Sequence, residues 1–114
     1  MSASILIVDD EVSILNSLSS ILEDEGYDVS VAKSGMEALK HCAMNPPELM
    51  MLDIWMPEMD GLETLKRLRE LVPNTQVMMM SGHGSIETAV KAIKLGAYDY
   101  IEKPLSLENV TLRV

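Results

Sequence analysis

Acidic, hydroxyl and basic residues stand directly after the most apolar segments of the chain. Asp9 and Asp10 follow the run Ile-Leu-Ile-Val, and Asp53 follows the run Leu-Met-Met-Leu. Ser81 comes after three methionines, and Lys103 comes after Tyr-Asp-Tyr-Ile-Glu. Carboxylates bind hard cations such as Mg²⁺, an ammonium group attracts phosphoryl oxygens, and a hydroxyl donates a hydrogen bond. Together these residues predict phosphoryl transfer onto the protein itself, with Asp53 as the nucleophile.

Five strand-like segments alternate with five helix-like segments, and these elements must position the polar residues. Continuous or alternating apolar residues predict strands over 4–9, 28–32, 48–53, 76–81 and 98–102. Helical periodicity and capping residues predict helices over 11–25, 34–44, 60–72 and 85–95, and a short helix from residue 106. Strict alternation is typical of an α/β fold with a parallel sheet covered by helices on both faces.

The apolar character of each strand predicts its place in the sheet. Segments 4–9, 48–53 and 76–81 are apolar on both sides and belong in the middle, whereas 28–32 and 98–102 alternate as edge strands do. Right-handed crossovers then favour the strand order 2-1-3-4-5. Because the carboxyl ends of parallel strands meet at one edge, the three carboxylates should converge there around a divalent cation.

The apolar positions of two helices predict which side chains face the sheet. For the helix over 34–44, the predicted inward residues are Met36, Leu39, Cys42 and Ala43. For the helix over 85–95, they are Ile86, Ala89, Val90 and Ile93.

Composition excludes several classes of protein. Eighteen acidic residues against nine basic ones give a net charge of −9, which repels nucleic acid and anionic membranes. Apolar runs such as 5–8 contain four residues, far fewer than the ~20 that a membrane-spanning helix needs. The single cysteine, Cys42, rules out an internal disulfide and suits a reducing compartment. We expect a cytoplasmic domain that binds neither nucleic acid nor membrane.

Four motifs in order resemble the receiver domains of two-component response regulators. They are Asp9 and Asp10, the stretch from Leu52 to Gly61 (LDIWMPEMDG), Ser81 with Gly82, and Lys103 with Pro104. The resemblance covers essentially the whole chain and implies a (βα)5 flavodoxin-like, or CheY-like, three-layer sandwich. It implies a signalling domain that assists its own phosphorylation and dephosphorylation, rather than an enzyme.

The resemblance also assigns roles to individual residues. Asp53 is the implied phosphorylation site, and one Mg²⁺, which Mn²⁺ or Ca²⁺ can replace, is the implied cofactor. Tryptophan is unusual at position 55, and the resemblance leaves its side-chain direction open. The implied residues are Asp9, Asp10, Asp53 and the backbone carbonyl of Trp55 for the metal, Ser81 and Lys103 for the phosphoryl group, Ser81 and Tyr100 for the switch, and Lys103 and Pro104 for a cis peptide bond.

The segments 81–84 and 97–104 are similar to receivers of the nitrogen-regulation class of sigma-54-dependent transcriptional activators. We therefore expect residues 1–114 to form one receiver domain that belongs to a longer protein with ATPase and DNA-binding domains. We also expect the fifth helix of this receiver domain to be cut short in the given sequence. The implied partners are a sensor histidine kinase and a second copy, bound through the fourth helix, fifth strand and fifth helix.

Two other functions are weighed against the receiver. A phosphatase of the haloacid dehalogenase type also uses an aspartate nucleophile, but needs a second acid two residues later, where this chain has Trp55. A flavodoxin-like module would bind a nucleotide or flavin, but the chain has no glycine-rich phosphate loop. His83, two residues after Ser81, is interpreted as a plain loop residue, the alternative being that it tunes the access of water to the site.

Overall fold

A computed structural model describes residues 3–82 and 86–102 of the 114-residue chain. Its centre is a parallel sheet of five strands in the order β2-β1-β3-β4-β5, which confirms the predicted topology. The strands are β1 (Ser4–Val8), β2 (Asp28–Ala32), β3 (Leu49–Asp53), β4 (Gln76–Ser81) and β5 (Asp99–Glu102). The helices are α1 (Val12–Asp24), α2 (Gly35–Met44), α3 (Gly61–Leu71) and α4 (Ile86–Lys94).

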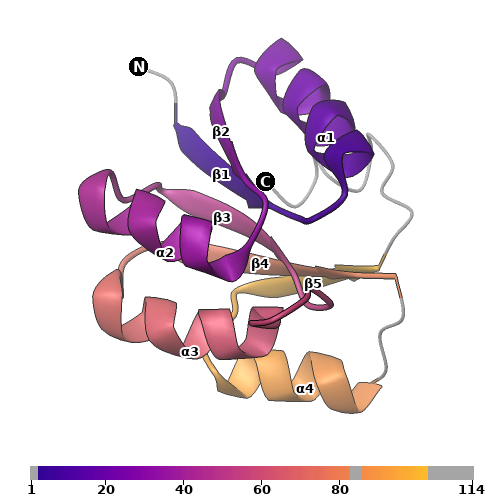
Figure 1. The fold of residues 1–114 in the computed structure, drawn as a ribbon, viewed down its shortest axis with the longest axis vertical. Coiled ribbons are helices and arrows are strands. Elements are labelled where there is room, and N and C mark those ends of the chain that lie inside the picture. The colour runs from indigo at the N-terminus through magenta and orange to yellow at the C-terminus, as the bar shows by residue number, and fades with distance from the viewer. Residues whose placement is uncertain (1–2, 83–85, 103–114) are drawn as a thin grey trace.

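The described helices cover both faces of the sheet, with α1 on one face and α2, α3 and α4 on the other (Figure 1). Because successive side chains of a strand point to opposite faces, each central strand contributes to two cores. Ile7 and Met51 pack on the α1 side, whereas Val8 and Leu52 pack on the other side. The central strands are therefore buried on both faces, as their continuous apolar runs predict.

Two predicted capping residues begin their helices as expected. The Ser34 hydroxyl accepts a hydrogen bond from the Glu37 backbone N–H at 3.2 Å, ahead of α2. The Asp60 carboxylate accepts one from the Glu63 N–H at 2.9 Å, ahead of α3. Each bond satisfies a donor of the first helical turn, so these helices begin where the sequence pattern places them.

The inward faces predicted for α2 and α4 are partly wrong. In α2, Met36 and Ala43 are exposed, and the buried residues are Gly35, Ala38 and Cys42. The helix turns its row of small residues to the neighbouring elements, and a Cβ added at Gly35 would overlap the Thr64 hydroxyl of α3. Because α2 and α3 lie close together, small side chains face the contact between them and larger apolar side chains do not fit there.

In α4 two of the four residues predicted to face inward lie on the surface, and Ala89 is partly buried, while the side chain of Ile86 lies outside what the structure describes. Val90 and Ile93 are 46% and 48% exposed, whereas Ala92 is fully buried. Ala92 packs in the same core cluster as residues of α2 and α3. The small side chain again faces the core, which leaves a branched apolar stripe on the surface of α4.

Some predictions fall on residues that the structure does not describe. The helix predicted from residue 106, the loop residue His83, and the Lys103–Pro104 bond all lie outside the described ranges. Within those ranges, no helix combines the length and the apolar character that crossing a membrane requires.

Candidate functional site

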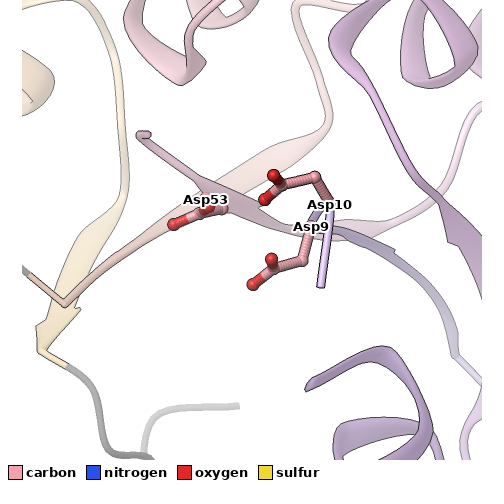
Figure 2. A group of neighbouring side chains, drawn as sticks. All are labelled: Asp9, Asp10 and Asp53. Carbon is pink, nitrogen blue, oxygen red and sulfur yellow. The ribbon is translucent and has the colours of Figure 1, made fainter. Parts of the chain in front are cut away.

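The three aspartates singled out by the sequence lie together at the carboxyl edge of the sheet. One carboxylate oxygen from each of Asp9, Asp10 and Asp53 lies within 4.8 Å of the others. Figure 2 shows the three side chains projecting from the ends of β1 and β3 toward one shared region. The predicted convergence of the carboxylates is confirmed.

Strand register brings these residues together. Val8 of β1 is paired with Leu52 of β3, so the residues that follow each of them, Asp9 and Asp53, lie side by side. The Asp9 backbone N–H continues the pairing with β2 by donating to the Ala32 carbonyl at 3.1 Å. The sheet thus brings together Asp9 and Asp53, which are more than forty residues apart in the sequence.

Each aspartate has a different environment. Asp9 is fully buried and Asp53 is 3% exposed, whereas Asp10 is exposed. The Asp9 carboxylate accepts a hydrogen bond of 2.9 Å from the Glu11 backbone N–H, just before α1 begins. This bond fixes the Asp9 side chain at the turn from β1 into α1.

The donor set fits a hard divalent cation. Three carboxylates within 4.8 Å of one another repel, and burial of two of them strengthens that repulsion. Oxygen ligands of this kind are those that Mg²⁺ and Ca²⁺ prefer in proteins. The arrangement of Asp9, Asp10 and Asp53 is therefore a candidate metal site whose chemistry matches the predicted cofactor.

The loop after Asp53 is held against the end of the sheet. The Ile54 N–H donates to the Met80 carbonyl at 3.0 Å, and the Gly61 N–H donates to the Ile54 carbonyl at 2.7 Å. Glu58, within the loop, adopts a left-handed backbone with φ of 67°. The loop from Trp55 to Asp60 thus leaves β3 and returns to it before α3 begins.

The side chains of Trp55 and Ser81 are joined, a contact that the sequence left open. The Trp55 indole N–H donates to the Ser81 hydroxyl oxygen at 3.1 Å. Ser81 is fully buried at the end of β4, whereas Trp55 is 50% exposed. An aromatic donor two residues after a candidate nucleophile was the available signal, but the sequence does not show where its ring points.

Tyr100, the predicted switch aromatic, lies on β5 with its ring packed partly buried against the core on the α2–α4 side. Its hydroxyl oxygen is buried and makes no hydrogen bond to any described residue. A buried polar group without a partner costs free energy. Ser81 lies opposite Glu102 in the register of β4 and β5, and Lys103, which comes next in the sequence, is outside the described residues.

Comparison with known proteins places this geometry in a family. The model of the response regulator receiver domain matches residues 5–114. The nitrogen assimilation regulatory protein NtrX of Azorhizobium caulinodans is 47% identical over 114 residues, which cover 98% of this chain and 25% of that protein. The chain spans about a quarter of the length of the curated relatives it matches.

Two solved structures share the fold. The crystal structure of a CheY-like receiver domain protein from Methanospirillum hungatei superposes with a TM-score of 0.95 at 35% identity, covering 99% of this chain and 90% of that one. The crystal structure of NtrX from Brucella abortus superposes with a TM-score of 0.93 at 44% identity, covering 99% of this chain and 26% of that one. The predicted similarity to nitrogen-regulation receivers is confirmed, and the chain belongs to the family of response regulator receiver domains.

Proposed function

We propose that Asp53 accepts a phosphoryl group from a sensor histidine kinase and that its phosphorylation controls an output in the cytoplasm. The observation that carries the proposal is the buried Asp53 carboxylate, at the end of a central strand and within 4.8 Å of two further carboxylates. Membership of the receiver family supports a signalling domain rather than a catalytic enzyme.

Asp9, Asp10 and Asp53 would hold one Mg²⁺, together with the backbone carbonyl of Trp55. The bound ion supplies charge neutralisation, without which an incoming phosphoryl dianion meets three carboxylates. The mixture of buried and exposed ligands supports this assignment, because Mg²⁺ keeps several waters and is seldom enclosed by protein alone. Mn²⁺ or Ca²⁺ would occupy the same oxygen ligands.

The chain's own contribution is position and charge. An Asp53 carboxylate oxygen forms a bond to phosphorus while the bond from phosphorus to the donor atom breaks. The donor atom is the imidazole nitrogen of a phosphohistidine or the acyl oxygen of acetyl phosphate. Ser81 donates a hydrogen bond to the transferred group, and Lys103 adds a positive charge. Water would later attack the same phosphorus while its bond to the Asp53 oxygen breaks, which releases inorganic phosphate and regenerates the Asp53 carboxylate. The domain thus assists its own phosphorylation and dephosphorylation.

The output would pass through Ser81 and Tyr100 to the surface of α4 and β5. Ser81 moves toward the phosphoryl group, and Tyr100 takes up the space that Ser81 leaves. The buried hydroxyl of Tyr100, which makes no hydrogen bond within the described part of the chain, supports such a rearrangement, because a buried polar group without a partner carries an energetic cost. The exposed Val90 and Ile93 of α4 support a contact surface there, for a second copy or for a neighbouring domain.

We further propose that residues 1–114 act as one receiver domain of a longer transcription regulator, with ATPase and DNA-binding domains of the sigma-54-dependent kind. The supporting observations are the NtrX relatives and the fact that this chain spans about a quarter of their length. In that arrangement the acidic receiver itself contacts no nucleic acid.

Phosphorylation is tested with acetyl phosphate and Mg²⁺, followed by borohydride trapping and mass spectrometry. We expect one modified residue, Asp53, and loss of the modification in Asp53→Asn. Asp28→Asn, an exposed aspartate at the amino end of β2, is the matched control and should be modified as wild type is. Modification of Asp53→Asn at the wild-type level would overturn the assignment. Excess EDTA should prevent the reaction.

A further inference from the structure

Trp55 and Ser81 form a hydrogen bond whose two partners come from different parts of the site. The donor is the Trp55 indole N–H, in the loop after β3, and the acceptor is the Ser81 hydroxyl oxygen at the end of β4, 3.1 Å away. Ser81 is the hydroxyl that the proposed function assigns to the phosphoryl group. The indole therefore acts on the very group that must respond to phosphorylation.

The backbone just before Trp55 is tied to the sheet, so the loop that carries the indole does not simply move with the Ser81 hydroxyl. The preceding residue, Ile54, donates its N–H to Met80 of β4 at 3.0 Å and accepts a hydrogen bond from Gly61 at 2.7 Å. Half of the Trp55 side chain is exposed, so burial alone does not hold the ring in place. The bond to Ser81 gives the ring a defined position at the rim of the site.

The indole and a phosphoryl group use different parts of the Ser81 hydroxyl, because its oxygen accepts from the indole N–H and its O–H would donate to the phosphoryl oxygen. The two contacts therefore oppose each other through the position that each requires of the hydroxyl. An indole N–H is a neutral donor, whereas a phosphoryl oxygen is a charged acceptor, and hydrogen bonds to charged groups are roughly twice as strong. A serine hydroxyl that shifts toward the phosphoryl group lengthens its bond to the indole, because the loop that carries Trp55 is tied to backbone atoms of Met80 and Gly61 and not to the serine side chain. The contact with the phosphoryl group should be the more stable one, but loss of the indole bond reduces the net free energy that the rearrangement gains.

We propose that Trp55 is a positioning residue that holds Ser81 in the position it has before Asp53 is phosphorylated. It thereby raises the free energy that phosphorylation must supply to switch the domain. The inference rests on the proposed function, because it needs a phosphoryl group on Asp53 and a response of Ser81. It differs from a role of the Trp55 carbonyl as a metal ligand, since only the side chain takes part.

The first test observes the bond directly. Trp55 is the only tryptophan, so its indole N–H gives one cross-peak in a ¹⁵N–¹H correlation spectrum. We expect slow solvent exchange of this proton in the wild-type chain and exchange several-fold faster in Ser81→Ala, which lacks the acceptor. Saturating Mg²⁺ and beryllofluoride, a phosphoryl mimic, should bring the wild-type exchange rate close to that of Ser81→Ala. An exchange rate unchanged by beryllofluoride would overturn the proposal.

The second test measures beryllofluoride affinity at saturating Mg²⁺. Trp55→Phe keeps an aromatic ring but removes the donor, so it should bind beryllofluoride about two- to tenfold more tightly than wild type. In the Ser81→Ala background the same substitution should have no effect, because its target is gone. Trp55→Leu is a second donor-free variant and should agree with Trp55→Phe in sign. Equal or weaker binding by both variants would refute the proposal.

The two proposals fail in different ways. If beryllofluoride binds Asp53→Asn as tightly as wild type, the proposed function fails and the role of Trp55 falls with it. If beryllofluoride needs Asp53 but neither Trp55 variant binds it more tightly, Asp53 remains the acceptor and only the role of Trp55 is lost.

Discussion

Gly61 lies against the backbone of Asp53 so closely that no larger residue fits. A Cβ built on Gly61 would overlap the Asp53 carbonyl oxygen and would lie 2.7 Å from the Ile54 Cα. Those atoms belong to backbone rather than to movable side chains, so the strand end itself would have to shift. The glycine that begins α3 is therefore part of what holds the candidate nucleophile in place.

Gly61→Ala should damage the site as well as the fold. We expect it to lower the free energy of unfolding by about 1–3 kcal/mol, as overpacking does, and to weaken Mg²⁺ binding because Asp53 is displaced. Gly26→Ala is the matched control. Its added Cβ would meet no atom within 4 Å, but φ is +95°, so it costs about 1–2 kcal/mol without touching the site. Equal Mg²⁺ affinity in both variants, by calorimetric titration, would contradict the prediction.

Asp10→Asn should stabilise the metal-free protein and weaken metal binding. Removing one of three neighbouring charges relieves repulsion, which is worth up to about 1 kcal/mol at low salt. The same change removes a ligand, so added Mg²⁺ should raise the melting temperature less than in wild type. Glu48→Gln, which makes the same charge change just before β3 at the opposite edge of the sheet, controls for net charge. Thermal unfolding with and without Mg²⁺ measures both effects. A lower stability of metal-free Asp10→Asn would argue against repulsion in the cluster.

Lys103→Ala should not weaken Mg²⁺ binding, in contrast to Asp10→Asn. The proposed function puts the Lys103 ammonium group at the phosphoryl group, near the metal. Its loss would then remove a repulsion of the metal, so we expect Mg²⁺ to bind as well as in wild type or better. The response to phosphorylation should be lost, because no ammonium group remains to contact the phosphoryl oxygens. Much weaker Mg²⁺ binding by Lys103→Ala would show that the lysine does not face the metal.

Cys42 should make the protein less stable at alkaline pH. Burial disfavours the thiolate and raises the pKa of Cys42 from 9.0 to about 11. Well below pH 9 the thiol is neutral in both the folded and the unfolded state. Between pH 9 and 11 only the unfolded chain loses the proton, which favours unfolding by up to about 2 kcal/mol.

The measurement compares urea unfolding of wild type and Cys42→Ala at pH 8 and pH 10.5. The variant loses packing at both pH values, so the test is the change between them, which should be smaller in Cys42→Ala. Equal pH dependence of the two proteins would show that Cys42 ionises as freely in the folded state as in the unfolded one.

The sequence by itself determined the strands, their order and the edge of the sheet where the candidate site residues lie. Continuous apolar runs ending in Asp9, Asp53 and Ser81 identify central strands, and parallel strands bring their carboxyl ends together wherever the helices lie. Helix starts at Ser34 and Asp60 were predictable for the same reason, because a cap joins residues three apart in the chain.

Only the tertiary structure decided which helix faces are buried and where the Trp55 indole points. Periodicity marks Val90 and Ile93 as an apolar stripe, but the space beside the sheet admits the smaller Ala92 instead. Trp55 and Ser81 are 26 residues apart, so their contact depends on how β3 and β4 are paired and not on any local pattern. Local sequence specifies backbone conformation, whereas the direction of a side chain depends on neighbours that only folding supplies.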